Sequence, residues 1–202
     1  MRFQPITAAI IILIALGPAV AGKRHVADDV TTASIDLAKS PVETRPSPLP
    51  VAGTIEIAFA PLPQRSAERL VMKVIDAAET SVFMAAYQMT SKPIADALCQ
   101  AATRGAAVSV VLDQRSNPHG EGNSKRDYLI SCGVDVKGDA RYPIMHDKFI
   151  VVDGQHVETG SFNYTFSAAE RNAENALVVW NNADMAKRYE AEFERLFAEA
   201  DD

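Results

Sequence analysis

The chain alternates short, continuously apolar segments with amphipathic ones, and this alternation restricts its fold more than any other feature. Buried strands are expected at residues 81–89 and 107–113, the second with the sequence AVSVVLD. Between them, Pro93 lies in the first turn of a helical segment that ends before Gly105. Strands that are apolar on both faces need cover on both faces. The sequence therefore predicts an α/β domain with a mixed β-sheet flanked by helices on both faces.

The remaining segments fit the same architecture. Ser66 is placed to cap a helix whose apolar residues fall on one face, and residues 183–200 form a second amphipathic helix. A shorter helix is expected at 125–132, and further strands are expected at 54–58, 134–137, 148–152, 157–159 and 176–180. No internal repeat is found in the sequence. We therefore expect one folded domain over residues 54–202.

The first 53 residues have a different character. Residues 1–21 show the pattern of a secretory signal peptide, with an apolar run at 8–16 and Ala-Val-Ala at 19–21 as a cleavage site. The run is shorter than the about 20 residues of a membrane-spanning helix, although an uncleaved anchor is the alternative. Residues 22–53, with prolines among polar residues, are expected to be a flexible tether. We expect an exported protein, periplasmic or secreted, with no stable membrane span after signal cleavage.

Charge and cysteine content exclude several classes of protein. Twenty basic against 26 acidic residues give a net charge of −6, which disfavours a broad basic surface for nucleic acid but permits a local basic cleft. Two cysteines are too few for a disulfide scaffold or a four-cysteine zinc site. In an oxidising compartment Cys99 and Cys132 are able to form a disulfide. The alternative is that each packs separately as a small apolar residue.

The residues that suggest chemistry lie between His146 and Glu174. His146, Lys148 and Asp153 have the spacing H-x-K-x4-D. Because alternate residues of a strand point to the same face, His146 and Lys148 are expected to face one target. An imidazole beside an ammonium suits a phosphate, since one group attacks or protonates while the other neutralises charge.

Two further groups follow in the same region. The sequence Gly-Ser-Phe-Asn at 160–163 places Ser161 and Asn163 on alternate positions, where both could bind phosphoryl oxygens. Glu174 opens an apolar strand, and fixing the tautomer of His146 would give its carboxylate a partner. Taken singly, these patterns are more typical of solvated strand edges and turns, and Asp153-Gly154 is typical of a hairpin turn. Their occurrence together in one order indicates a site.

The segments HDKFIVVD, GSFN and ENALVVW together resemble the phospholipase D superfamily, and most resemble its small, single-motif, exported bacterial endonucleases. The resemblance extends over the folded region, including AAYQMT at 85–90 and VVLD at 110–113. It implies a phosphodiesterase that needs no metal and no other cofactor. It implies that His146 attacks phosphorus to form a phosphohistidine, that Lys148, Ser161 and Asn163 hold phosphate oxygens, and that Glu174 orients His146. Asp153 is expected to be structural.

The implied mechanism needs a second histidine to protonate the leaving group. His25, His119 and His156 are the other histidines, and none is followed by x-K. We therefore expect a symmetric homodimer in which two copies of His146 share one site. Two histidines with opposite protonation states predict a bell-shaped pH profile of the rate.

The substrate is less constrained than the chemistry. The leading hypothesis is a non-specific endonuclease that acts on DNA or RNA. The alternative is a phospholipase D that acts on phosphatidylcholine or cardiolipin, and a third possibility is a non-catalytic nucleic-acid-binding protein. Substrate contacts are expected from cationic side chains, each of which is otherwise scattered surface charge: Arg115, Arg141 and Arg171, with Lys125, Arg126 and Lys137 as further candidates.

Overall fold

The computed structural model describes residues 53–61, 64–120 and 122–201. The predicted signal peptide at 1–21 and the predicted tether at 22–53, except Gly53, lie outside the described residues. Within the described ranges, none of the helices has the length and apolar character that a membrane crossing requires.

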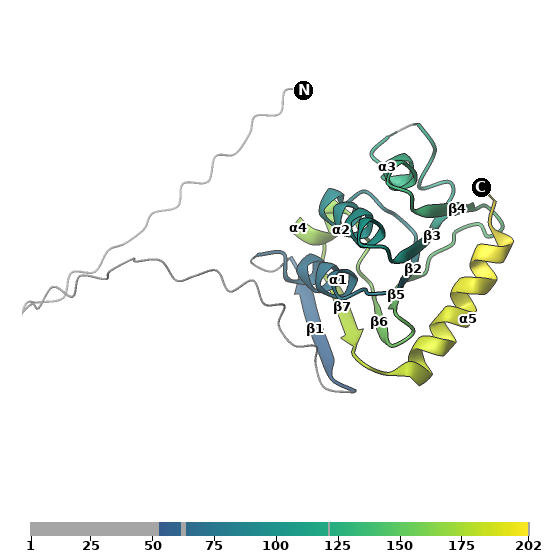
Figure 1. Cartoon of the computed structure of the whole chain (residues 1–202). Helices are drawn as coiled ribbons and strands as arrows, with labels where there is room; N and C mark the ends of the chain where they lie inside the picture. The colour runs from purple at the N-terminus through teal and green to yellow at the C-terminus, as the bar shows by residue number, and fades with distance from the viewer. Residues whose placement is uncertain (1–52, 62–63, 121, 202) are drawn as a thin grey trace, which may run out of the picture. The chain divides into compact units, whose positions relative to one another are not determined.

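One seven-stranded sheet forms the centre of the described region, with the strand order β1-β7-β6-β5-β2-β3-β4 (Figure 1). Strands β2, β3 and β4 are parallel to one another, whereas the other pairings are antiparallel. The mixed sheet predicted from the sequence is therefore confirmed. The strands are β1 (Ile55–Ala60), β2 (Ser81–Ala86), β3 (Ala107–Asp113), β4 (Asp135–Asp139), β5 (Lys148–Val152), β6 (His156–Gly160) and β7 (Glu174–Val179).

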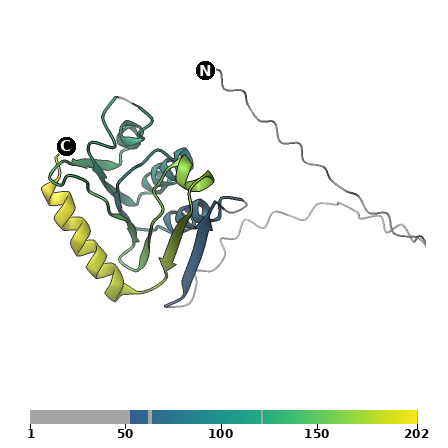
Figure 2. The same ribbon diagram turned by 180° about the vertical axis from the view of Figure 1, so that it is seen from behind.

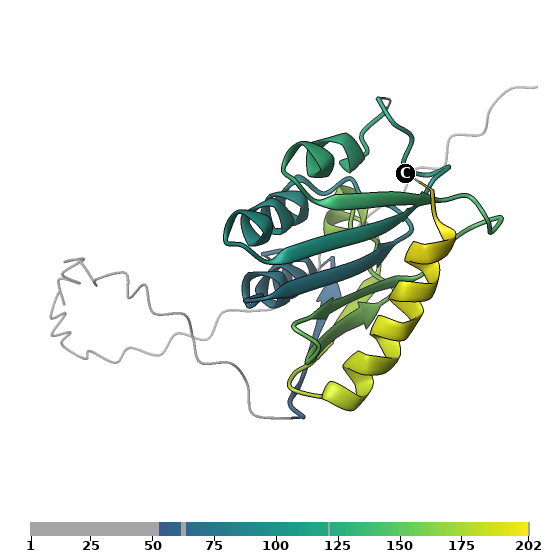
Figure 3. The same ribbon diagram turned by 45° about the vertical axis from the view of Figure 1, so that its right-hand side comes forward.

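Helices cover both faces of this sheet, as predicted. Helices α1 (Ser66–Asp76) and α2 (Lys92–Thr103) lie on one face, and the long α5 (Ala183–Glu199) crosses the other (Figures 2 and 3). Two short helices, α3 (Arg126–Ser131) and α4 (Phe166–Glu170), follow β3 and β6. Helix α5 packs on β2 to β6, while β1 pairs with β7 and packs on α1.

Two apolar clusters hold these layers together. Under α1 and α2, the buried side chains include Leu70, Val74, Ile94, Leu98, Ile150 and Trp180. Under α5, they include Val111, Phe149, Val151, Phe193 and Leu196. Each fully buried side chain of this size contributes about 1.5–3 kcal/mol. The continuous apolar character of β3 and β5 thus follows from their position between two helical layers.

The structure differs from the sequence-based expectations at three places. Ser66 does not cap α1, because its hydroxyl donates to Phe59 O at 2.7 Å and the preceding Arg65 is left-handed, with φ of 53°. The strand expected at 157–159 begins one residue earlier, at His156 of β6, whose Nδ1 accepts from Asn181 N at 3.0 Å. Helix α4 was not expected, because its five residues are too few to show helical periodicity.

Cys99 of α2 and Cys132, which directly follows α3, form a disulfide with a Cα–Cα distance of 5.4 Å. The sequence left open whether these cysteines are bonded or packed separately, and in the structure they are bonded. The bridge ties α3 to the face of the sheet that α2 covers.

Candidate active site

The predicted site residues meet at one edge of the sheet. The register pairs Lys148, the first residue of β5, with Ala86 at the end of β2, and it pairs Gly160, the last residue of β6, with Ala176 near the start of β7. Because neighbouring strands in this part are antiparallel, these strand ends lie at the same edge. The fold therefore brings together His146, Lys148, Ser161, Asn163 and Glu174.

His146 and Lys148 both lie against Tyr87, which follows β2. The His146 and Tyr87 ring centroids are 4.8 Å apart, and Lys148 Nζ lies 5.5 Å from the Tyr87 centroid. The strand begins at Lys148, so His146 precedes it and is exposed. Tyr87 was not recognised from the sequence as a site residue. Because both side chains contact the Tyr87 ring, the imidazole of His146 and the ammonium of Lys148 lie beside one another.

Lys148 is held in a position that suits an anion. The residue is 8% exposed, and its Nζ donates to the backbone carbonyl of His146 at 2.7 Å. Burial lowers the pKa of Lys148, while the charges of Asp147 and Glu174 act in the opposite direction. A buried ammonium whose hydrogen bond goes to a neutral carbonyl gains from a bound anion, since the anion replaces lost hydration.

Glu174 supports Ser161 from the start of β7. The Ser161 hydroxyl donates to Glu174 Oε2 at 2.6 Å, and Asn172 Nδ2 donates to Oε1 at 3.0 Å. Among the residues that the structure describes, the imidazole of His146 has no hydrogen-bond partner. Within one chain, the carboxylate of Glu174 is thus engaged by Ser161 and Asn172 and not by the imidazole.

The loop after β6 alternates between the site and the core. Phe162 is 1% exposed and Tyr164 is fully buried, while Ser161 is exposed and Asn163 is half-buried. The amide oxygen of Asn163 is buried and has no hydrogen-bond partner within the described part of the chain. The two aromatic anchors therefore hold Ser161 and Asn163 toward the sheet edge.

Gly160 is required where this loop leaves the strand. A Cβ at this position would lie 2.3 Å from the backbone carbonyl oxygen of Asn175. The same carbonyl accepts from the backbone N–H groups of Ser161 and Phe162, both at 3.1 Å. The absence of a side chain lets β6 and β7 approach closely enough to set the path of the loop.

Asp113 is a site-supporting residue that sequence reasoning did not single out. It is 2% exposed, its Oδ2 accepts from Met145 N at 3.0 Å, and its Oδ1 accepts from Ser116 N at 2.8 Å. Met145 directly precedes His146, so the carboxylate of Asp113 fixes the backbone that carries the imidazole. The sequence feature that could have identified Asp113 is its position as the one carboxylate at the end of an otherwise apolar strand.

Asp153 lies at the opposite end of β5 and β2. It occupies the β5–β6 hairpin turn with φ of 52°, followed by Gly154 with φ of 62°, as in a type I′ turn. Its carboxylate accepts from the N–H groups of Glu79, Thr80 and Ser81 at 2.8–2.9 Å and from the Thr80 hydroxyl. These contacts hold the turn against the start of β2, far from Lys148.

The six cationic candidates are dispersed. Arg115 donates to the carbonyls of Tyr142 and Pro143, at 2.9 and 2.8 Å, and so braces the segment before His146. Arg141 pairs with Glu199 at 3.0 Å, and Arg171 lies over the ring of Phe166.

The other three candidates do not form one basic surface either. Arg126 is buried, with 1% exposure, and is therefore not a surface contact. Lys137 lies over Phe197, while Lys125 is half-buried. The positive charge at the site therefore comes mainly from Lys148.

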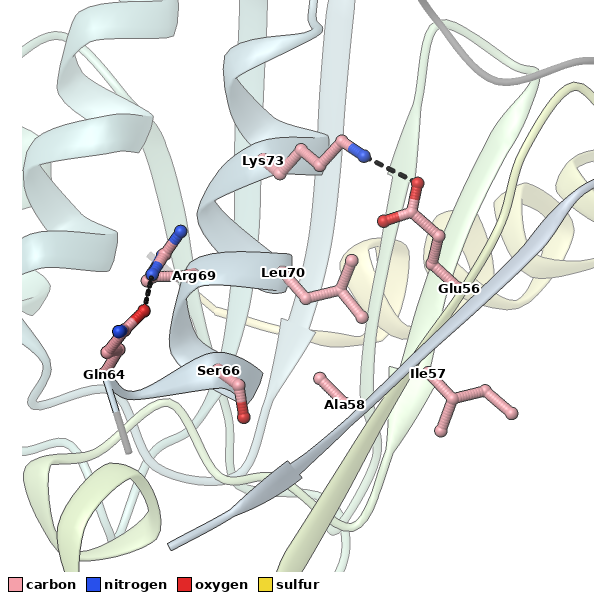
Figure 4. A pocket seen from close by; sticks show the side chains of 8 residues that line it. All are labelled: Glu56, Ile57, Ala58, Gln64, Ser66, Arg69, Leu70 and Lys73. Carbon is pink, nitrogen blue, oxygen red and sulfur yellow. Dashed lines mark hydrogen bonds and ion pairs between the residues drawn. The ribbon is translucent and has the colours of Figure 1, made fainter. Parts of the chain in front are cut away.

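A separate groove lies between β1 and α1 (Figure 4). Lys73 pairs with Glu56 across it at 2.6 Å, and Arg69 donates to Gln64 at 3.0 Å. None of the predicted site residues lines this groove. Among the described residues, no group of three or more His, Cys, Asp or Glu side chains is arranged to hold a metal ion.

The fold is of the α/β class, with a mixed seven-stranded sheet between two helical layers. At one edge of this sheet a His/Lys pair faces a Ser/Asn loop, so the site is built on strand ends. Residues 71–197 match the family model described as the PLD-like domain of cardiolipin synthase. The chain belongs to the phospholipase D superfamily.

Relatives and solved structures agree with this assignment. A phospholipase D of Rickettsia conorii is 38% identical over 127 residues, which are 63% of this chain and 62% of the relative. A mitochondrial cardiolipin hydrolase of Xenopus laevis is 34% identical over 154 residues, which are 75% of this chain and 71% of the relative. Nuc of Salmonella typhimurium, a phospholipase D family member, is 36% identical with a TM-score of 0.69, covering 74% of this chain and 97% of Nuc.

Proposed function

We propose that the protein is a phosphodiesterase that acts through a covalent phosphohistidine and requires no metal. The observation that carries this proposal is the meeting of His146, Lys148 and the Ser161–Asn163 loop at one sheet edge, in a member of the phospholipase D superfamily. His146 is exposed and beside a buried ammonium. That arrangement suits attack on a phosphate whose negative charge Lys148 balances.

In the first step, a ring nitrogen of His146 forms a bond to phosphorus while the bond from phosphorus to the leaving oxygen breaks. A second, protonated imidazole gives its proton to that oxygen. In the second step, the same imidazole takes a proton from water, the water oxygen bonds to phosphorus, and the phosphorus–nitrogen bond breaks.

Each remaining site residue has a place in this scheme. Lys148, Ser161 and Asn163 hold the nonbridging oxygens, and they do so most strongly as charge develops in the transition state. Glu174 positions Ser161 through its hydrogen bond. For Glu174 also to orient an imidazole, as the family resemblance implies, its carboxylate must accept from that imidazole with a further lone pair when substrate or a second subunit arrives.

We propose that the second imidazole is His146 of another copy in a symmetric homodimer. An exposed apolar strip supports this, because Ile55, Ile57 and Phe59 of β1 are 56%, 58% and 55% exposed. These side chains lie on the face of β1 that points away from α1, as Ile57 shows in Figure 4. Strand β1 ends at Ala60, which pairs with Glu174, so the strip leads directly to the site edge.

We favour a non-specific endonuclease. The resemblance of the motif to the small, single-motif, exported bacterial endonucleases of the superfamily supports this choice, as do the small size of the domain and the similarity to Nuc. The test is an assay of purified protein on plasmid DNA, RNA, phosphatidylcholine and cardiolipin with EDTA present. We expect nicking of plasmid DNA or cleavage of RNA in EDTA; loss of all nucleolytic activity on adding EDTA would overturn the metal-independent mechanism.

His146→Asn is the matched variant for this assay. Removing the nucleophile should lower the rate by at least about 10³-fold while the fold is retained. His119→Asn is the control, since His119 is an exposed histidine that pairs with Asp127 and has no place in the mechanism. Full activity of His146→Asn would show that the nucleophile lies elsewhere.

The second candidate is a phospholipase D. The similarity to the phospholipase D of Rickettsia conorii and the cardiolipin hydrolase of Xenopus laevis favours it. Two exposed apolar side chains near the site, Ile144 at 54% and Phe166 at 51% exposure, favour it as well. Hydrolysis of phosphatidylcholine or cardiolipin vesicles, without cleavage of DNA or RNA, would select this function. Both candidates use the same residues.

A further inference from the structure

Beneath the site lies a buried pair that the proposed mechanism does not use. Glu158 of β6 is 1% exposed, and Tyr164, which directly follows Asn163, is fully buried. The Tyr164 hydroxyl donates to Glu158 Oε2 at 2.8 Å. Burying a carboxyl group in an apolar layer costs free energy. The position of Glu158 under the site loop therefore suggests that it serves the site.

The surroundings of Glu158 are apolar. By register, Ile150 of β5 and Val178 of β7 flank it on the face that packs under α1. Helix α5 packs on the other face of β6, against Val157. Among the residues that the structure describes, no cation therefore balances a negative charge on Glu158.

The charged side chains of α1 are engaged elsewhere. Glu68 accepts from Ser91 and Arg65, Arg69 donates to Gln64, Lys73 pairs with Glu56, and Asp76 lies near Arg104. Burial raises the pKa of Glu158 to about 8, with the Tyr164 hydrogen bond acting in the opposite direction. The carboxyl group is thus protonated at neutral pH, with one oxygen accepting from Tyr164.

Tyr164 joins the site loop to a second segment. Its backbone carbonyl accepts from Thr90 N at 3.0 Å and from Ser91 N at 2.9 Å, where β2 leads into α2. Its ring contacts that of Phe162, with centroids 6.3 Å apart. The side-chain hydroxyl is the remaining point of attachment, and Glu158 holds it.

We propose that Glu158 and Tyr164 are positioning residues for Asn163: their hydrogen bond fixes the loop at 160–165 so that Ser161 and Asn163 face the phosphate. This inference rests on the proposed function, in which those two side chains bind phosphoryl oxygens. A shift of about 1 Å in such a group is able to cost about 10²-fold in rate. A carboxyl that stays neutral serves this purpose because it brings no uncompensated charge under the site.

Kinetics of three variants test the proposal. Tyr164→Phe should lower kcat by about tenfold or more and change KM by less than about twofold, because the loop acts mainly on the transition state. Glu158→Gln resembles the protonated acid, with a donor and an acceptor, so it should keep kcat at neutral pH. Tyr128→Phe is the control, since it removes a similar hydrogen bond to Asp96 between α2 and α3.

Two variants at position 158 separate positioning from a merely structural role. Glu158→Leu removes the acceptor of the Tyr164 hydroxyl, so it should lower kcat about as far as Tyr164→Phe does, whereas Glu158→Gln keeps an acceptor and should retain kcat. Equal kcat in folded Glu158→Leu and folded Glu158→Gln would overturn the proposal. Because this comparison does not involve Tyr164→Phe, it decides the matter even if Tyr164→Phe does not fold.

Hydrogen exchange provides a measurement that does not depend on activity. In Tyr164→Phe, amides of 160–165 and 90–91 should exchange at least about tenfold faster than in the wild type, while β3 amides do not change. Unchanged exchange at the loop in Tyr164→Phe would contradict the proposal. If the wild type cleaves no phosphodiester, the proposed function fails, whereas these exchange rates still decide whether the pair fixes the loop.

Discussion

Single residues in this protein owe their roles to neighbours that are distant in sequence. Lys148 is identifiable from the H-x-K spacing, but its burial and its contact with the Tyr87 ring are not. Asp113 fixes the backbone before His146 across 32 residues of sequence. Residue types that carry phosphate chemistry can be recognised in a linear pattern, because their spacing is set by strand geometry. Supporting residues such as Asp113 and Tyr87 depend on which strands become adjacent.

Asp153→Asn is expected to destabilise the fold without removing the chemistry. Burial would raise the pKa of the Asp153 carboxyl, but hydrogen bonds from Glu79, Ser81 and Thr80 hold it below its ordinary value. A lowered folded-state pKa stabilises the fold above the unfolded-state pKa, and this stability is lost as the pH falls through the folded-state value. The variant should lose about 2 kcal/mol near neutral pH.

The measurement is chemical denaturation of both proteins at several pH values. The difference between wild type and Asp153→Asn should shrink as the pH falls below about 4. Asp147→Asn is the control, since Asp147 is exposed beside Lys148 and caps no turn. A variant with wild-type stability at neutral pH would show that the turn does not depend on the Asp153 carboxylate.

At the scale of elements, apolar patterning was sufficient for the main strands and helices. Strands β3 and β5 are apolar on both faces, and the structure places each between two helical layers. Helix α4 and the start of β7 were harder to define, since tertiary contacts at Asn172 and Glu174 set their ends. The hairpin at Asp153-Gly154 was predictable because two left-handed residues favour Asp and Gly.

The disulfide is the covalent link between two such elements. Its closed loop has a sequence separation of 33 residues, for which loop entropy gives about 3–4 kcal/mol of stabilisation. The double variant Cys99→Ser/Cys132→Ser should therefore lose about that free energy of unfolding, with activity retained in the folded fraction. Reduction of the wild type should lower its stability to the same level, as measured by denaturation with and without dithiothreitol. Equal stability of oxidised and reduced protein would contradict a bonded pair.

For the whole molecule, the proposed mechanism predicts a homodimer, and the disulfide predicts an oxidising compartment. The pattern at residues 1–21 supports export, and the Cys99–Cys132 disulfide is of the kind found in exported proteins. We propose a periplasmic or secreted location. The N-terminal sequence of protein recovered from an exported fraction, with Gly22 first, would support it.

Ile57→Lys tests the proposed dimer surface. A charge in the middle of the apolar strip of β1 should prevent association, because an unpaired ammonium would be buried in the interface. The variant should be monomeric by light scattering and should lose at least about 10²-fold in activity, since each site would lack its second imidazole. Ile130→Lys, at a residue of α3 that is 43% exposed, is the matched control and should remain dimeric and active. A fully active monomer of either protein would refute the shared site.

The proposed phosphohistidine intermediate on His146 can be observed directly. The protein is mixed with bis(p-nitrophenyl) phosphate, a phosphodiester that is neither nucleic acid nor lipid, and is quenched within the first turnover in alkali. Digestion with trypsin yields the peptide from Tyr142 to Lys148, in which His146 is the one histidine. Mass spectrometry should find the nitrophenyl phosphoryl group on this peptide, acid-labile and absent from His146→Asn. Turnover without any modified peptide, or with the group on another residue, would contradict the account.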